Sequence, residues 1–187
     1  RNCCMFLSNG DTSKVYNNTL VTGESNTGQL AIMLRADTGV CHPVLVNNLF
    51  ASYNSDHCYT SMYHMNNGST NYPSAVTTNL YYVEPTTGAD GEYMYYGGSN
   101  SYNVNALNFP TRTVPIYGGT AQVLTSTAAG WNNKVNVDPQ LIDPEIGEFH
   151  IGGSSPALGA GTDLSQYFTT DRDGYTRSVP WSIGAYD

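Results

Sequence analysis

The chain has 187 residues, with 7 lysines and arginines against 15 aspartates and glutamates, a net charge of -8 and a charged fraction of only 12%. This balance excludes a nucleic-acid binder that works by charge, because the chain would repel phosphates. Asn, Ser, Thr, Gly and Tyr favour strands and turns over a helical bundle, while 40% hydrophobic residues exclude a disordered chain.

The N-terminal residues 2–7 read as the middle of a buried strand, although the chain opens on Arg1 without a methionine. We therefore expect a further segment upstream of this strand. No apolar run approaches the roughly 18 residues that a membrane span requires, so we expect no membrane insertion.

The four cysteines, Cys3, Cys4, Cys41 and Cys58, lack the spacing of a zinc site. They fit buried small side chains, one disulfide such as Cys41 with Cys58, or metal ligands. The sequence leaves these alternatives open.

A repeat of about 30 residues runs through the first half of the chain. Each copy joins a short apolar run to an amide, and these amides are separated by 30 and then 31 positions, at Asn18, Asn48 and Asn79. Other strand-like runs lie between the copies, so each period holds more than one strand. These runs occupy residues 30–34, 59–63 and 93–96.

Such a repeat, with strands and turns but no helical periodicity, predicts an all-β fold made of coils of a parallel β-solenoid. Each coil adds about 4.8 Å by pairing with the one before it. Asn18, Asn48 and Asn79 would then stack as an amide ladder at one corner. An antiparallel sandwich is the alternative, but continuous apolar runs and the near-constant period disfavour it.

The C-terminal part has a different composition, with Pro and Gly at several positions and a short apolar end. Its landmarks are residues 137–144, 149–151, 155–161, 171–177 and 183–186. This succession resembles the closing coils of right-handed parallel β-helix proteins of the pectate-lyase-like superfamily, especially secreted and surface bacterial members. The resemblance implies a single domain, with stacked coils in residues 1–134 and the terminal coils and cap in residues 135–187.

The tail also carries a turn and a cap that can be interpreted from its residues alone. Asp171 and Asp173 are placed to accept backbone N–H groups of a turn, and Gly174 supplies a positive φ. Arg177 could pair with one of these carboxylates. We expect residues 183–186 to form a last strand that covers an open coil edge.

Enzymes of the superfamily that the tail resembles are polysaccharide lyases and hydrolases, which use clustered carboxylates with calcium or a basic residue. Here the nearest acids, Asp56, Glu84, Asp90 and Glu92, do not follow the repeat. We therefore predict no catalytic residue, no metal site and no cofactor, with calcium left open.

Tyrosines concentrate in the middle of the chain and are the better functional signal. A tyrosine offers a flat apolar face and a hydroxyl, both of which suit sugar rings or a partner protein. The residues we predict for carbohydrate or partner binding are Tyr81, Tyr82, Tyr93, Tyr95 and Tyr96.

The sequence thus predicts an extracellular or cell-surface β-helix that is structural and adhesive, and that binds glycans or neighbouring subunits without catalysis. A homo-oligomer or head-to-tail assembly would cover its end coils. The alternatives are a polysaccharide lyase or glycoside hydrolase, and a tailspike or decoration protein on a virion surface.

Overall fold

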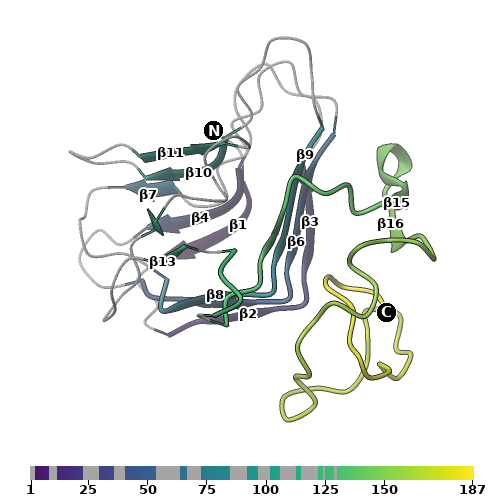
Figure 1. The fold of residues 1–187 in the computed structure, drawn as a ribbon. Coiled ribbons are helices and arrows are strands. Elements are labelled where there is room, and N and C mark those ends of the chain that lie inside the picture. Colours follow the sequence, from purple (N-terminus) through teal and green to yellow (C-terminus); the bar gives the residue numbers. More distant parts are fainter. Residues whose placement is uncertain are drawn as a thin grey trace.

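The computed structural model describes residues 3–8, 12–22, 30–35, 41–53, 64–66, 73–84, 92–96, 102–105, 113–114, 122–123, 125–128 and 130–187. Across these residues the chain is almost entirely β, with one 3-10 turn, η1 (Pro144–Ile146). Three sheets built mainly of parallel strands make up the N-terminal part (Figure 1).

Successive strands of each sheet come from successive copies of the repeat, which confirms the predicted parallel pairing. Val15 pairs with Leu45, and Leu45 pairs in turn with Val76. The first sheet contains, in order of hydrogen-bonded neighbours, β1 (Cys3–Ser8), β4 (Leu30–Arg35), β7 (His64–Asn66), β10 (Glu92–Tyr96) and β11 (Tyr102–Asn105). The second contains β2 (Lys14–Tyr16), β5 (Val44–Val46) and β8 (Ala75–Thr77). The third contains β3 (Thr19–Thr22), β6 (Leu49–Ser52), β9 (Leu80–Val83) and β14 (Lys134–Val135).

Antiparallel pairs interrupt this pattern in three places. The strand β11 runs antiparallel to β10 at the edge of its sheet. Two short hairpins form from β12 (Thr113–Val114) with β13 (Gln122–Val123), and from β15 (Leu141–Asp143) with β16 (Glu148–Ile151). The described part of the chain therefore contains antiparallel pairs beside the parallel sheets, which the repeat did not predict.

A sharp corner joins the sheet of β2, β5 and β8 to the sheet of β3, β6, β9 and β14. In each repeat the corner begins with a residue of positive φ, a conformation that asparagine adopts more readily than most residues. Three of the four residues are asparagines, and the set is Asn17 (50°), Asn47 (57°), Thr78 (51°) and Asn132 (46°). The local sequence thus sets the bend.

The inner faces of the parallel sheets bury mainly apolar side chains. Phe50 and Tyr81 stack there, with ring centroids 5.2 Å apart and an interplanar angle of 7°. Ile32, Leu45 and Val76 are completely buried as well. Equivalent positions of successive repeats therefore pack on one another in register.

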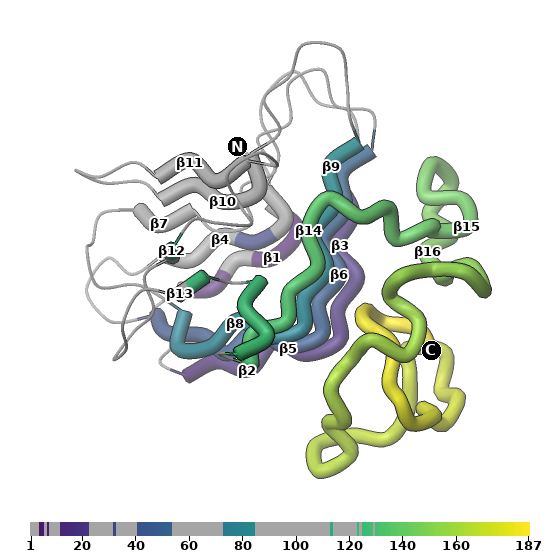
Figure 2. Tube along the Cα trace, in the orientation of Figure 1, coloured from purple at the N-terminus to yellow at the C-terminus, as the bar shows by residue number. Residues whose placement is uncertain are grey.

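The C-terminal segment, residues 136–187, lies along the outer side of the sheet of β3, β6, β9 and β14 (Figure 2). Alternate side chains of β6 and β9 face outward and form a second core with it. The buried members of this core are Leu49, Ala51, Leu80, Tyr82, Leu141, Ala157 and Ile183. Because all residues of β6 and β9 are buried, these strands read as continuous apolar runs.

The predicted final strand at residues 183–186 is wrong. Gly184 has a φ of 106°, which breaks an extended strand. Its N–H donates to Asn47 O at 2.8 Å, and Ile183 N donates to Ala157 O at 2.9 Å. The chain end thus binds the side of the corner instead of adding a strand to an open edge.

Candidate functional site

The three predicted asparagines form a hydrogen-bonded ladder inside the corner. Asn18 Nδ2 donates to Asn48 Oδ1 at 3.0 Å, and Asn48 Nδ2 donates to Asn79 Oδ1 at 2.9 Å. Each acceptor oxygen also takes a backbone N–H, as from Asn18 N to Asn48 Oδ1 at 3.1 Å. These amides link strands of successive repeats, and among the described contacts only the oxygen at the end of the ladder, Asn18 Oδ1, accepts no hydrogen bond.

Asn133 continues the ladder and was missed by the repeat analysis. Its Oδ1 accepts from Asn79 Nδ2 at 3.1 Å and from Asn79 N at 2.9 Å. It follows Asn79 by 54 positions, so a spacing of 30 or 31 could not reveal it. The available signal was the pair of asparagines at 132 and 133, just before a short strand.

The asparagines that precede the ladder residues point outward and hold the C-terminal segment. Asn17 Nδ2 donates to Ser182 O and to Gly184 O, both at 3.0 Å. Asn47 Nδ2 donates to Thr162 O at 2.7 Å, while Asn47 Oδ1 accepts from Thr162 N at 2.8 Å. Each Asn-Asn pair therefore serves two functions, one inside the coil and one outside it.

Two of the predicted binding tyrosines are buried. Tyr81 is completely buried against Phe50, and Tyr82 is 8% exposed and packs against Tyr53. These two rings are unavailable to a ligand, because the C-terminal segment covers the outer face of β9 and the interior fills the other. The side chains of the other three lie outside the described residues: Tyr93, Tyr95 and Tyr96.

The acidic turn of the tail forms as predicted at Asp171 and Gly174, whereas Asp173 Oδ2 lies 2.7 Å from His150 Nε2 instead of accepting a backbone N–H group of the turn. Asp171 Oδ1 accepts from Asp173 N at 3.0 Å and from Tyr175 N at 2.9 Å. Gly174 has a φ of 88°. Asp171 and Arg172 of this turn lie beside the first corner.

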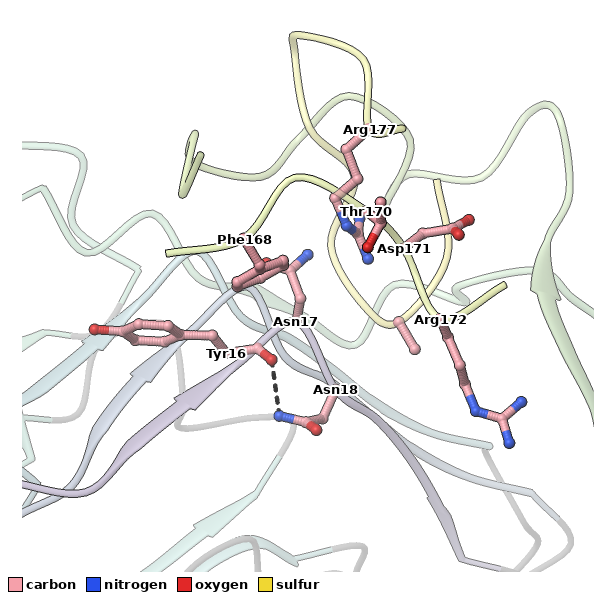
Figure 3. A pocket seen from close by; sticks show the side chains of 9 residues that line it. Tyr16, Asn17, Asn18, Phe168, Thr170, Asp171, Arg172 and Arg177 are labelled. Atoms are coloured by element: carbon pink, nitrogen blue, oxygen red, sulfur yellow. Dashed lines mark hydrogen bonds between the residues drawn. The ribbon is translucent and has the colours of Figure 1, made fainter. Parts of the chain in front are cut away.

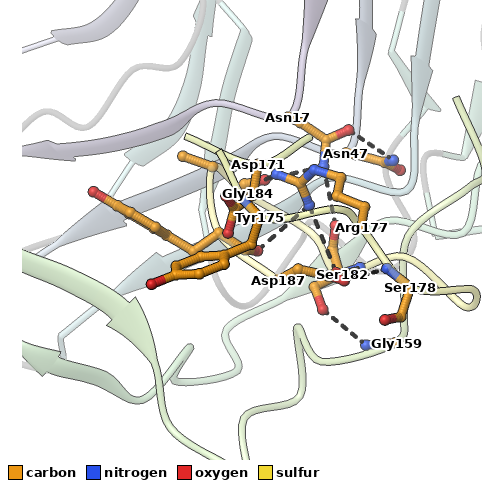
Figure 4. Close-up of polar contacts among 12 residues, drawn as sticks. Asn17, Asn47, Gly159, Asp171, Tyr175, Arg177, Ser178, Ser182, Gly184 and Asp187 are labelled. Carbon is orange, nitrogen blue, oxygen red and sulfur yellow. Dashed lines mark hydrogen bonds and ion pairs between the residues drawn. The ribbon is translucent and has the colours of Figure 1, made fainter. Parts of the chain in front are cut away.

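Arg177 is buried and holds the chain end in place (Figure 4). Its Nη2 donates to Gly184 O at 3.0 Å, and its Nη1 lies 3.7 Å from a carboxylate oxygen of Asp187. The predicted ion pair with Asp171 or Asp173 is therefore replaced by one with Asp187. Burial lowers the pKa of Arg177, and Asp187 opposes this effect.

A pocket of about 340 Å³ opens where the first corner meets the loop before the acidic turn (Figure 3). We call it the corner pocket. It combines two aromatic rings with amide, hydroxyl, carboxylate and guanidinium groups. Its lining residues are Tyr16, Asn17, Asn18, Phe168, Thr170, Asp171, Arg172, Arg177 and Ala185.

Several polar atoms of the corner pocket can still form hydrogen bonds with a ligand. Within the described part of the chain, no donor bonds Asn18 Oδ1, because this residue lies at the end of the ladder. Asp171 uses Oδ1 for the turn, which leaves Oδ2. Arg172 Nη1 donates to Tyr186 Oη at 2.8 Å, and the other N–H groups of this guanidinium can donate to a ligand.

Positive charge gathers at this pocket although the chain is acidic. Arg172 and Arg177 line it, and Lys14 Nζ lies 4.4 Å from the ring centroid of Tyr167. Tyr167 packs in turn on Tyr16, with centroids 5.2 Å apart. Burial, followed by a hydrogen bond to Tyr167, raises the pKa of Tyr16, so this ring stays neutral.

A second pocket, of about 450 Å³, lies on the other side of the acidic turn. Leu158, Tyr175 and Pro180 give it apolar walls, and Asp171 borders both pockets. The acidic turn therefore sets the shape of two neighbouring surfaces.

No group of three or more His, Cys, Asp or Glu side chains is placed to hold a metal ion in the part of the chain that the structure describes. Nor does that part hold a helix long and apolar enough to cross a membrane. Cys41 is buried and its thiol donates to Leu7 O at 3.7 Å, while Cys58 lies outside the described residues.

The chain matches no protein-family model, and comparisons with curated proteins and with solved structures find no significant match.

Proposed function

We propose that this chain is a right-handed parallel β-helix of the extracellular or cell surface, which works as a non-catalytic adhesive scaffold and binds a saccharide in the corner pocket. A virion surface is an equally suitable setting for such a scaffold. The observation that carries the proposal is the composition of the corner pocket.

The stacked repeat supports the scaffold part of the proposal. Strands from three successive repeats pair in parallel at two sides of a corner, and an amide ladder links them there. Each added coil repeats the contacts of the last one, which gives a stiff rod. The C-terminal segment then buries one side of this rod.

The groups of the corner pocket are those that recognise sugars. A pyranose has C–H faces that pack on aromatic rings, as Tyr16 and Phe168 provide. Its hydroxyls both donate and accept, so they suit the oxygens of Asn18 and Asp171 and the N–H groups of Arg172, which all line the pocket. The volume of about 340 Å³ is in the range of small-ligand sites.

The acids of this pocket support binding without hydrolysis. Glycoside hydrolases use two carboxyl groups on either side of the scissile bond. Among the described residues that line the corner pocket, Asp171 is the one carboxylate, and it also caps the turn.

The proposal is tested by passing the purified chain over a panel of immobilised neutral, amino and acidic polysaccharides. We expect retention on at least one of them, with no new reducing or unsaturated ends. Cleavage would replace the proposal with an enzymatic function. Absence of retention on every member of the panel, while the chain is folded, would contradict saccharide binding.

Replacing Arg172 by glutamine should weaken saccharide retention about tenfold or more, because a charge-assisted hydrogen bond is lost. Arg172 is exposed, so the variant should keep the stability of the parent chain. Lys134→Gln is the matched control, since it removes the same charge from β14. Equal affinities of the two variants, measured by titration calorimetry, would remove Arg172 from the site.

A further inference from the structure

A histidine bridges the second hairpin and the acidic turn. His150 of β16 contacts Glu148 Oε1 through Nδ1, and its Nε2 lies 2.7 Å from Asp173 Oδ2. The imidazole also packs on the ring of Tyr186, with centroids 4.0 Å apart. One side chain thus touches three parts of the C-terminal segment.

The two carboxylate contacts require a proton on the ring. A neutral imidazole carries one N–H and can donate to one of the two acids, whereas the imidazolium donates to both. The hydrogen bond to Glu148, followed by the one to Asp173, raises the pKa of His150 from its ordinary value of 6.5. The same contact with His150 lowers the pKa of Glu148.

This contact bears on the corner pocket through the acidic turn. Asp173 N donates to Asp171 Oδ1 at 3.0 Å, and Asp171 and Arg172 both line the pocket. Arg172 N donates to Ala185 O at 2.9 Å, and its guanidinium donates to the hydroxyl of Tyr186, the residue on whose ring His150 packs. A contact that fixes Asp173 therefore also fixes the wall of the corner pocket, which Asp171 and Arg172 form.

We propose that Glu148, His150 and Asp173 form a proton-dependent clasp that orders this wall, so that the corner pocket binds its saccharide more tightly when His150 is protonated. The saccharide part of this inference rests on the proposed function. The clasp itself is a property of the chain without ligand.

The direction of the pH dependence follows from the two shifted groups. The pKa of His150 is raised in the folded chain. The protonated ring therefore stabilises the clasp fully below the unfolded pKa of 6.5, and this stabilisation is lost as the pH rises through the raised pKa. The pKa of Glu148 is lowered from 4.5, so the stabilisation that its ionised carboxylate provides is lost only when the pH falls through the lowered pKa. The charged or titratable groups that face the clasp are Glu148, Asp173, Tyr186 and, behind that ring, Arg172. The clasp is therefore closed in mildly acidic solution and opens toward alkaline pH.

The clasp is tested first on the chain without ligand, by an NMR titration of His150 and by amide protection in residues 171–177. We expect an apparent pKa above 6.5. We also expect protection factors, corrected for intrinsic exchange, to fall about three- to tenfold between about pH 5.5 and about pH 8.5. Asp173→Asn should lower the pKa of His150, whereas Asp163→Asn, which removes a charge elsewhere in the segment, should not. A pKa at or below 6.5, or protection that does not change with pH, would overturn the proposal.

Saccharide affinity is then measured at both pH values, for the parent chain and for His150→Phe, which keeps a ring over Tyr186 but cannot donate. The inference predicts weaker binding at high pH in the parent chain and no pH change in the variant. Binding that is equal at both pH values in the parent chain would reject the link to the pocket and leave the proposed function intact. No binding at either pH, together with the expected loss of protection, would reject the proposed function and leave the clasp intact.

Discussion

Replacing Asn48 by alanine should lower the free energy of unfolding by about 3–5 kcal/mol, because it leaves several buried polar groups without partners. Asn48 is completely buried and its side chain makes four hydrogen bonds. Two of them are donated, to Val15 O and Asn79 Oδ1, both at 2.9 Å. The other two are accepted from the main chain and side chain of Asn18.

The matched comparison is Asn18→Ala, at the end of the same ladder. Asn18 is only partly buried, and its side chain donates to Tyr16 O and Asn48 Oδ1, both at 3.0 Å. We expect a loss of about 1–2 kcal/mol here, measured like the first by urea denaturation. Equal losses for the two variants would show that the amides do not act as a ladder with an interior and an end.

Replacing Gly184 by alanine should cost about 2–4 kcal/mol, because the added methyl group meets the corner and the backbone is strained. A Cβ at this position would lie 2.7 Å from Thr19 Oγ1 and 3.3 Å from Leu49 Cβ. The φ of 106° is also one that L side chains rarely adopt. The variant should lift the chain end from the first two coils and expose the second core, which dye binding and thermal unfolding would detect.

The control for this prediction is Gly153→Ala in the same C-terminal segment. A Cβ at Gly153 meets no atom within 4 Å, so we expect a change of no more than about 0.5 kcal/mol. If Gly184→Ala is as stable as Gly153→Ala, the chain end does not dock against Thr19 and Leu49.

The parallel pairing of successive repeats could be predicted because its signal is periodic. A short apolar run and an amide return at a constant interval, and the amides that mark this interval bond one another in the structure. The acidic turn was also predictable, since Asp171 and Gly174 act within a few residues of each other. Regular spacing and local turn chemistry are both visible in a single sequence.

The remaining features depend on contacts between distant parts of the chain. The burial of Tyr81 and Tyr82 follows from coil stacking and from the cover that residues 136–187 provide, neither of which a tyrosine-rich stretch reveals. The corner pocket joins Tyr16 and Asn18 to residues that follow them by about 150 positions, and no motif links the two sets. Arg177 pairs with Asp187 because the chain end folds back, whereas Asp171 accepts N–H groups of its own turn and Asp173 contacts His150.

The stacking of coils is tested most directly by nuclear Overhauser contacts between side-chain amides in a chain labelled at asparagine. Paired strands of a sheet lie about 4.8 Å apart, which places successive amides of the ladder within reach of such contacts. The account predicts cross-peaks from Asn18 to Asn48, from Asn48 to Asn79 and from Asn79 to Asn133, each lost when either partner is replaced by aspartate. Assigned amides that show no cross-peaks between these pairs would contradict it.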